Sequence, residues 1–189
     1  MVKKSQPTEI YQLKVTLKYS KPPIWRRLLV PSDIPLNKLH DVFQIAFAWT
    51  DSHLHQFIVG EDEYYGEPDP DDYLEIRDEH HYTLKDIAPG AGCKFIYEYD
   101  FGDSWEHIVV VEKVLPPDPA QVYPVCIKGR LAAPIEDIGG VWGYYEFLDA
   151  MKDPHHPDHA SYVEWYGADD IDPDAFDLDL INKSLHSLK

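Results

Sequence analysis

The sequence predicts an α+β fold, in which a mixed, mostly antiparallel sheet is packed by an N-terminal helix and by a C-terminal helical segment. Apolar–polar alternation and short apolar runs, which are typical of strands, occupy most of residues 9–128. Helical spacing and helix-start residues instead dominate residues 140–189. Strands followed by helices favour α+β order over alternating βαβ units. The length of 189 residues fits one domain, 1–189.

The predicted strands end at residues that interrupt the backbone hydrogen bonds of a sheet. Between Ile10 and Tyr19 every second residue is apolar or aromatic, and Lys21-Pro22-Pro23 separates this strand from the next, with which it should form a hairpin. Because Ile108–Val111 is apolar on both faces, the strand that contains it should be central. Strands are predicted at residues 10–19, 24–30, 53–59, 93–99 and 105–115, with a short extended piece at 123–127 that turns at Lys128-Gly129.

The predicted helices follow from helical spacing and from proline positions. Six apolar residues at this spacing make the core face of the N-terminal helix: Leu36, Leu39, Val42, Phe43, Ala46 and Phe47. Later helices are predicted at residues 144–151, 157–166 and 173–188, the last two with a proline near the start. Between the strands, residues 61–81 are a polar excursion, and their acid- and proline-rich part, 67–72, is predicted to be a surface loop.

Charge and cysteine content narrow the class of protein. Thirty-four acidic residues against 17 basic ones give a formal net charge of −17, which makes non-specific nucleic-acid binding unfavourable because a phosphate backbone would be repelled. Cys93 and Cys126 are too few for a disulfide framework and are expected to be reduced thiols. Met1–Thr8 is polar, and no apolar run approaches the roughly 20 residues that span a bilayer. These features predict an acidic cytoplasmic protein without a membrane segment.

The stretch Tyr97–His107 carries packing residues and chemical groups in the same few positions. Its eleven residues include four aromatics, four carboxylates and one histidine, around a turn at Gly102. Such density is more typical of a site than of a plain hairpin, so the candidate binding residues here are Asp103, Trp105, Glu106 and His107. The alternative is structural, because aspartates often accept hydrogen bonds from the N–H groups of their own turn.

Two further stretches supply candidate ligands. His53 and His55 form a His-x-His pair on a predicted strand, which can hold a divalent metal together with Asp103, Glu106 or His107; the alternative is a polar edge strand. Glu136 and Asp137 lie in the glycine-rich segment 130–145. Free N–H groups of a following helix could bind phosphate there, whereas the two carboxylates would oppose an anion and could instead cap that helix.

Taken together, these motifs indicate a protein family that the chain resembles. The chain resembles the plasmid pRiA4b ORF-3-like family in the stretches Pro22–Arg27, Leu39-His40, Trp49–His55, Tyr97–His107 and Arg130–Tyr145. The resemblance implies a roll-like α+β domain of an uncharacterised family associated with plasmids or mobile elements. Some members carry a resolvase label. A recombinase needs clustered basic groups to hold an anionic duplex, and four arginines on this acidic chain argue against that activity.

Two functions remain as hypotheses. The first is a binding or interaction domain whose rim around Tyr97–His107, with Trp25, Trp49 and Trp142 as neighbours, takes a protein or peptide partner, which an acidic rim would favour as basic. The second is a metal-dependent hydrolase or nuclease with a divalent metal as cofactor. Its ligands and general base would come from Asp100, Asp103, Glu106 and His107, joined by His53, His55 or His40. Convergence of Asp103, Glu106 and a histidine in one concave pocket would favour the enzyme. The sequence does not indicate an oligomeric state.

Overall fold

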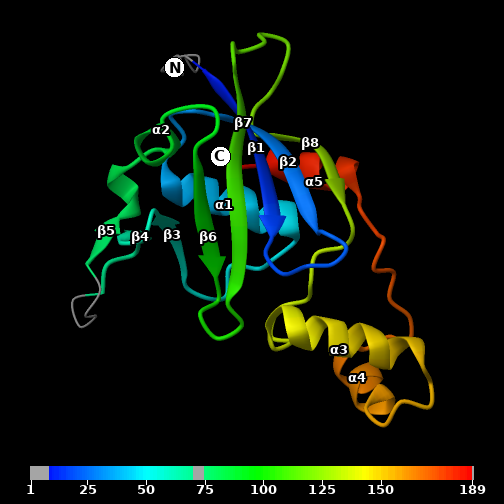
Figure 1. Cartoon of the computed structure of the whole chain (residues 1–189). Coiled ribbons are helices and arrows are strands. Elements are labelled where there is room, and N and C mark those ends of the chain that lie inside the picture. The colour runs from blue at the N-terminus through cyan, green and yellow to red at the C-terminus, as the bar shows by residue number, and fades with distance from the viewer. Residues whose placement is uncertain (1–8, 70–74, 189) are drawn as a thin grey trace.

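The computed structural model describes residues 9–69 and 75–188 (Figure 1). The predictions for residues 1–8, and part of that for the loop at 67–72, lie outside this range. The strands are β1 (Ile10–Leu17), β2 (Trp25–Pro31), β3 (His55–Val59), β4 (Glu63–Gly66), β5 (Ile76–Asp78), β6 (Lys94–Tyr99), β7 (Trp105–Leu115) and β8 (Val125–Arg130). The helices are α1 (Leu36–Phe47), the 3-10 turn η1 (Glu79–His81), α2 (Leu84–Ile87), α3 (Gly140–Lys152), α4 (His159–Tyr166) and α5 (Leu178–Leu185).

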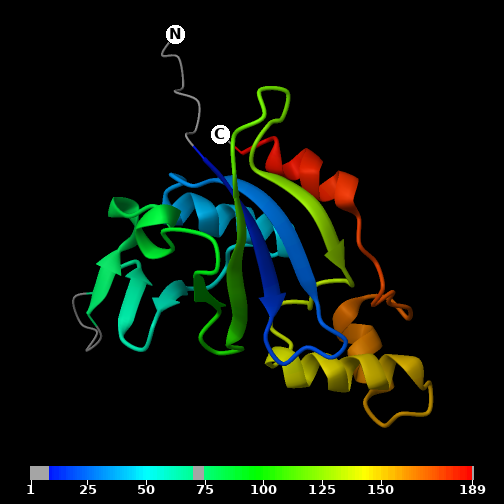
Figure 2. The same cartoon turned by 45° about the horizontal axis from the view of Figure 1, so that its top comes forward.

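The strands form one sheet in the order β5-β4-β3-β6-β7-β1-β2-β8. Every pair is antiparallel except β4 and β5, so the predicted mixed, mostly antiparallel sheet is confirmed. The predicted hairpin of β1 and β2 and the central position of β7 are also confirmed. Helix α1 crosses one face of the sheet, and α5 packs beside it and beside β8 (Figures 1 and 2).

The core forms between α1 and the inward side chains of the sheet. Leu39, Val42 and Phe43 on α1 are fully buried, as the helical spacing predicts. Period-two alternation turns Phe57, Tyr97 and other strand residues toward this helix, and they are fully buried too. Each such side chain stabilises the fold by about 1.5–3 kcal/mol relative to an exposed position. Packing of α1 against alternating strand residues therefore fixes the sheet that carries the site.

The segment between β3 and α2 differs from the prediction. Residues 61–81 were expected to be a polar excursion, yet they contain the short strands β4 and β5, of which β5 forms the edge of the sheet. Tyr65 on β4 is only 3% exposed and contacts Tyr82 edge to face, with ring centroids 4.9 Å apart. Because β4 has four residues and a single strongly buried aromatic, its alternation is too short to be recognised.

Three boundaries in the C-terminal half also differ. β8 continues through Lys128-Gly129, where a turn was predicted, since Gly129 lies against the Phe176 ring and has no side chain to block it. Helix α3 begins at Gly140 and not at residue 144. Helix α5 begins at Leu178, because the Asp177 carboxylate accepts a hydrogen bond from the Leu180 N–H at 2.8 Å; the predicted start at residue 173 is wrong.

Candidate functional site

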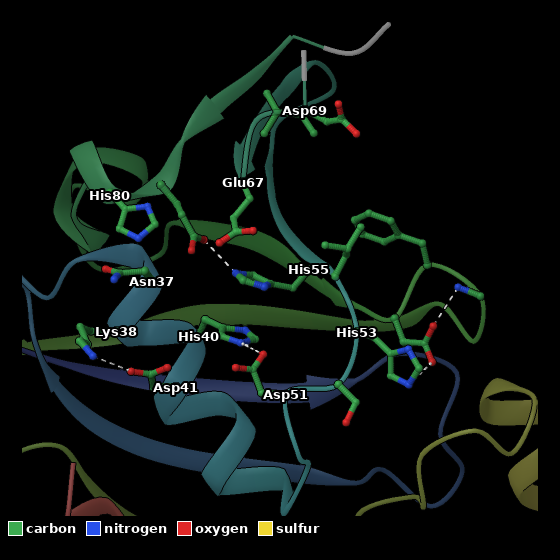
Figure 3. Close-up of a pocket in the computed structure, with 17 residues that line it drawn as sticks. Asn37, Lys38, His40, Asp41, Asp51, His53, His55, Glu67, Asp69 and His80 are labelled. Carbon is green, nitrogen blue, oxygen red and sulfur yellow. Dashed lines mark hydrogen bonds and ion pairs between the residues drawn. The ribbon is translucent and has the colours of Figure 1, made fainter. Parts of the chain in front are cut away.

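An open pocket of about 850 Å³ lies beside α1, where His55 of β3 and Ile76 of β5 contribute to its lining (Figure 3). Its lining is dominated by carboxylates and histidines. The lining side chains are Asn37, Lys38, His40, Asp41, Asp51, Ser52, His53, Leu54, His55, Glu67, Asp69, Ile76, Glu79, His80, Asp100, Phe101 and Gly102. Six of these are acidic and one is a lysine, Lys38, which pairs with Asp41 at 3.0 Å. The pocket therefore presents a negative surface.

Two stacked histidines form the floor of the pocket. The rings of His40 on α1 and His55 at the start of β3 lie parallel, with centroids 3.5 Å apart and an interplanar angle of 10°. Each has a carboxylate partner: His40 Nε2 lies 2.8 Å from Asp51 Oδ1, and His55 Nε2 lies 2.8 Å from Glu79 Oε2 (Figure 3). The pair places one buried imidazole, His40, and one that is 11% exposed, His55, between two acids.

Burial and neighbouring charge set the protonation of His40. Desolvation lowers the pKa of His40, the adjacent His55 ring lowers it further, and the Asp51 carboxylate opposes both effects. His40 Nδ1 also lies 2.8 Å from the Tyr97 hydroxyl, so both ring nitrogens have partners. His40 is thus a fixed, mainly neutral residue of the pocket floor. Neither of its ring nitrogens is free to bind a substrate.

The segment after α1 is held in shape by specific hydrogen bonds. Asp51 has a positive φ of 57°, which an aspartate tolerates better than most residues. Its N–H donates to the Gln44 side chain at 2.9 Å, and Ser52 N–H donates to the Tyr99 hydroxyl at 2.9 Å. These bonds direct the Asp51 carboxylate toward His40, although its side chain remains 60% exposed.

A second group of acidic and imidazole side chains meets at the edge of this pocket. His53 Nε2 lies 3.1 Å from Asp137 Oδ1 and 3.6 Å from Asp100 Oδ2. His53 precedes β3, Asp100 begins the turn between β6 and β7, and Asp137 belongs to residues 131–139, here called the 131–139 loop. Of the candidates from sequence, the structure brings together His53, Asp100 and Asp137.

Two other candidates, Asp103 and Glu136, join the 131–139 loop to the rest of the fold. Asp103 Oδ2 accepts hydrogen bonds from the N–H groups of Ile138 and Gly139 at 3.1 and 3.2 Å. Glu136 accepts from the Thr50 hydroxyl at 2.7 Å and from the Tyr99 hydroxyl at 2.5 Å. The Tyr99 pKa is raised by burial and by this carboxylate. Both acids position the site and lie outside the pocket lining.

The glycines of residues 130–145 allow the 131–139 loop to lie close to the β6–β7 hairpin. A Cβ on Gly140 would lie 2.4 Å from the Asp103 carbonyl oxygen, and one on Gly143 would lie 1.9 Å from the Ile138 carbonyl oxygen. Gly140 also has a φ of 69°. The glycine-rich sequence thus allows the 131–139 loop to pack against the hairpin. Glu136 and Asp137 were expected to cap the following helix, but α3 has no side-chain cap, because Glu136 bonds Thr50 and Tyr99 and Asp137 faces His53.

Trp105, Glu106 and His107 do not reach the pocket. Neighbouring residues on a strand point to opposite faces, so Glu106 and His107 cannot share a site. Glu106 forms an ion pair with Lys18 on the other face of the sheet. Trp105 and His107 are fully buried, and burial lowers the pKa of His107 to about 3. Asp103, Glu106 and a histidine do not converge in the described part of the chain, so the arrangement that would have favoured the enzyme is not found there.

Sequence reasoning missed two of the carboxylates that contact the histidines. Asp51 falls at the predicted end of the N-terminal helix, and Glu79 falls in the polar excursion 61–81. His40 was interpreted as a hydrogen-bonded packing residue, with a role as a ligand or catalytic group as the alternative. Leu39-His40 and Trp49–His55 did belong to the stretches that carried the family resemblance, and this was the signal that could have linked them.

The fold and site define an α+β domain with an open, acidic, histidine-lined pocket. Comparison with known proteins identifies the family. Residues 9–180 match the model of the plasmid pRiA4b ORF-3-like protein family, and the chain belongs to this family. It is similar to the uncharacterized protein y4hQ of Sinorhizobium fredii, with 38% identity over 95% of this chain and 92% of that protein.

A solved structure supports the same assignment. The crystal structure of MM3350, a protein of unknown function from Methanosarcina mazei Go1, is 34% identical and superposes with a TM-score of 0.80 over 95% of this chain and 98% of that one. This similarity confirms the α+β fold. Within residues 9–69 and 75–188, none of the helices is long and apolar enough to cross a bilayer.

Proposed function

We propose that this chain is a cytoplasmic binding domain whose acidic pocket takes a basic peptide segment of a protein partner. The observation that carries the proposal is the lining, in which six carboxylates face one lysine that is already paired with Asp41. A cationic side chain that enters would meet complementary potential on several sides. The formal net charge of −17 would also speed its approach at low salt.

The apolar residues at the pocket favour a peptide over a small cation. Leu54 and Phe101 line the pocket and are 62% and 46% exposed, so they offer apolar contact area next to the acids. Binding surfaces on proteins commonly combine a few such anchors with a polar rim. A segment with lysine or arginine beside an apolar residue fits both parts of the lining.

This location differs from the surface expected from sequence. Trp49 and Trp105, expected near the binding rim, are 7% and 0% exposed and belong to the core. Trp142 is 70% exposed but lies on α3, where it stacks on Tyr19. The pocket beside α1 is therefore the better candidate for the partner surface.

The test is fluorescence anisotropy with labelled lysine- and arginine-containing peptides and matched acidic peptides, at two salt concentrations. Only basic peptides should bind, and affinity should fall with salt because the screening length shrinks from about 10 Å at 0.1 M to about 3 Å at 1 M. The double variant Asp51→Asn with Glu67→Gln should weaken binding about ten-fold, since two partly exposed charges contribute on the order of 0.5–1 kcal/mol each.

The matched control is the double variant Asp149→Asn with Glu164→Gln on α3 and α4, an equal loss of charge at exposed positions outside the pocket lining. It should leave the affinity unchanged. Equal binding of acidic and basic peptides, or equal losses in the control and in the Asp51→Asn, Glu67→Gln double variant, would contradict the proposal.

A further inference from the structure

His53, Asp100 and Asp137 form a compact set of metal-ligand side chains beside the acidic pocket. One donor atom from each lies within 4.8 Å of the other two. Within the described residues this is the one group of three or more histidine, cysteine or acidic side chains that converges so closely. The ligands come from three segments, namely the approach to β3, the β6–β7 turn and the 131–139 loop.

The imidazole nitrogen at the centre of this set lacks a hydrogen bond. His53 Nε2 is shielded from solvent and has no hydrogen-bond partner among the residues that the structure describes. It nevertheless faces Asp137 Oδ1 at 3.1 Å and Asp100 Oδ2 at 3.6 Å. In the tautomer with the proton on Nδ1, Nε2 would present a lone pair to the two carboxylate oxygens, and a cation between the three atoms would satisfy all of them.

The hydrogen bonds that hold Asp100 and the 131–139 loop leave the proposed ligand atoms free to bind a metal ion. Asp100 Oδ1 accepts from the Gly102 N–H at 3.0 Å, which fixes the carboxylate and leaves Oδ2 toward His53. Asp103 holds the 131–139 loop through Ile138 and Gly139, and this brings Asp137 next to His53. Ligands held in this way by outer hydrogen bonds are typical of metal sites.

We propose that His53, Asp100 and Asp137 bind one divalent transition-metal ion. One imidazole with two carboxylates suits Zn²⁺ or Mn²⁺, whereas Mg²⁺ and Ca²⁺ prefer ligand sets made of oxygen alone. Three protein ligands leave coordination positions for water or another group. The ion would link the three segments at the edge of the pocket. This inference goes beyond the proposed peptide binding and does not depend on it.

Isothermal titration calorimetry with Zn²⁺ and with Mn²⁺ tests the site. The decisive variant is Asp137→Asn, because its side chain is 68% exposed and asparagine accepts the positive φ of 61°, so the fold is retained. His53→Gln removes the nitrogen ligand. Each variant should weaken binding of the preferred ion by more than about ten-fold, since losing even an outer partner of a metal ligand costs about 10–100-fold.

Asp149→Asn and His155→Gln are the matched controls, because both residues are exposed and lie outside the set. They should bind the ion as the wild type does. The proposal is overturned if neither ion binds the wild type saturably, which would leave the three side chains as a simple ion-pair cluster, or if Asp137→Asn binds as tightly as the wild type. Circular dichroism verifies the fold of each variant; should His53→Gln not fold, Asp137→Asn decides alone.

Discussion

The β6–β7 hairpin and the acidic pocket contain the same kinds of residue but use them differently. In Tyr97–His107, strand alternation buries the rings of Tyr97, Tyr99 and Trp105 in the core. In the pocket, residues far apart in sequence, such as His40 and Glu79, meet through α1, β3 and η1. Most of the dense stretch thus serves packing, and only its turn residues Asp100, Phe101 and Gly102 line the pocket. Convergence in space, and not density along the chain, marks the candidate site.

The largest expected effect concerns the core role of the hairpin. Trp105→Ala should lower the free energy of unfolding by about 3–5 kcal/mol, because it removes a fully buried indole and leaves a cavity. Phe101→Ala, four residues earlier and 46% exposed, should change it by less than about 0.5 kcal/mol. Urea denaturation measures both. Similar losses in the two variants would mean that the hairpin is not divided into core and surface as described.

The second effect tests Asp103 as the residue that positions the loop. Asp103→Ala removes the acceptor for the Ile138 and Gly139 N–H groups and should cost about 1.5 kcal/mol of unfolding free energy. It should also weaken metal binding, although Asp103 is not a proposed ligand, because Asp137 loses its position. Unchanged metal affinity in a folded Asp103→Ala variant would show that the metal site does not need the hydrogen bonds from Ile138 and Gly139 to Asp103.

The third effect is a pH dependence that comes from the buried hairpin histidine. The His107 pKa is about 3 in the folded protein against 6.5 for the free group, because burial penalises the charged form. Between these values the unfolded chain binds a proton that the folded chain does not. The free energy of unfolding therefore falls as the pH falls through this window, by up to about 1.4 kcal/mol per pH unit. His40, whose pKa is also lowered, contributes with the same sign.

Urea denaturation at pH 6.5 and pH 5.0 isolates the histidine contribution. This range lies above the window between 4.5 and about 2 in which Glu112, whose pKa is lowered by Arg27, loses its stabilising charge. The wild type should lose about 1–2 kcal/mol more than His107→Leu does over this range. A pH dependence in His107→Leu equal to that of the wild type would contradict the burial of a neutral imidazole.

The smallest expected effect concerns Lys38 at the pocket. Lys38→Ala removes the one basic side chain of the lining, and its exposed pair with Asp41 contributes at most about 0.5 kcal/mol to stability. Basic-peptide affinity should rise by about two-fold in anisotropy titrations, since a like charge is removed. A lower affinity would place Lys38 among the groups that hold the ligand.

Much of the fold could be predicted because its pattern is local. The alternation of Tyr11, Leu13 and Val15 and the helical stripe of α1 are set by a few adjacent residues, and the structure confirms them. The strands β4 and β5 could not be found in this way, because four and three residues carry too little periodicity.

The candidate site was less predictable because it depends on long-range pairing. His53 and Asp137 were selected from their own short motifs, but their shared partner Asp100 depends on how the hairpin turn meets two distant loops. Because side chains alternate along a strand, Glu106 and His107 lie on opposite faces of β7. The sequence could have shown this, but both residues were selected because Tyr97–His107 is rich in aromatic and charged residues.

The central claim is that the acidic pocket beside α1, and not the Trp105–His107 part of the hairpin, contacts the partner. The most direct measurement compares basic-peptide affinity in the Asp51→Asn, Glu67→Gln double variant with that in Glu106→Gln, which removes a carboxylate of the hairpin that pairs with Lys18. The double variant should bind about ten-fold more weakly, and Glu106→Gln should bind as the wild type does. A loss confined to Glu106→Gln, with full affinity in the pocket variant, would contradict the claim.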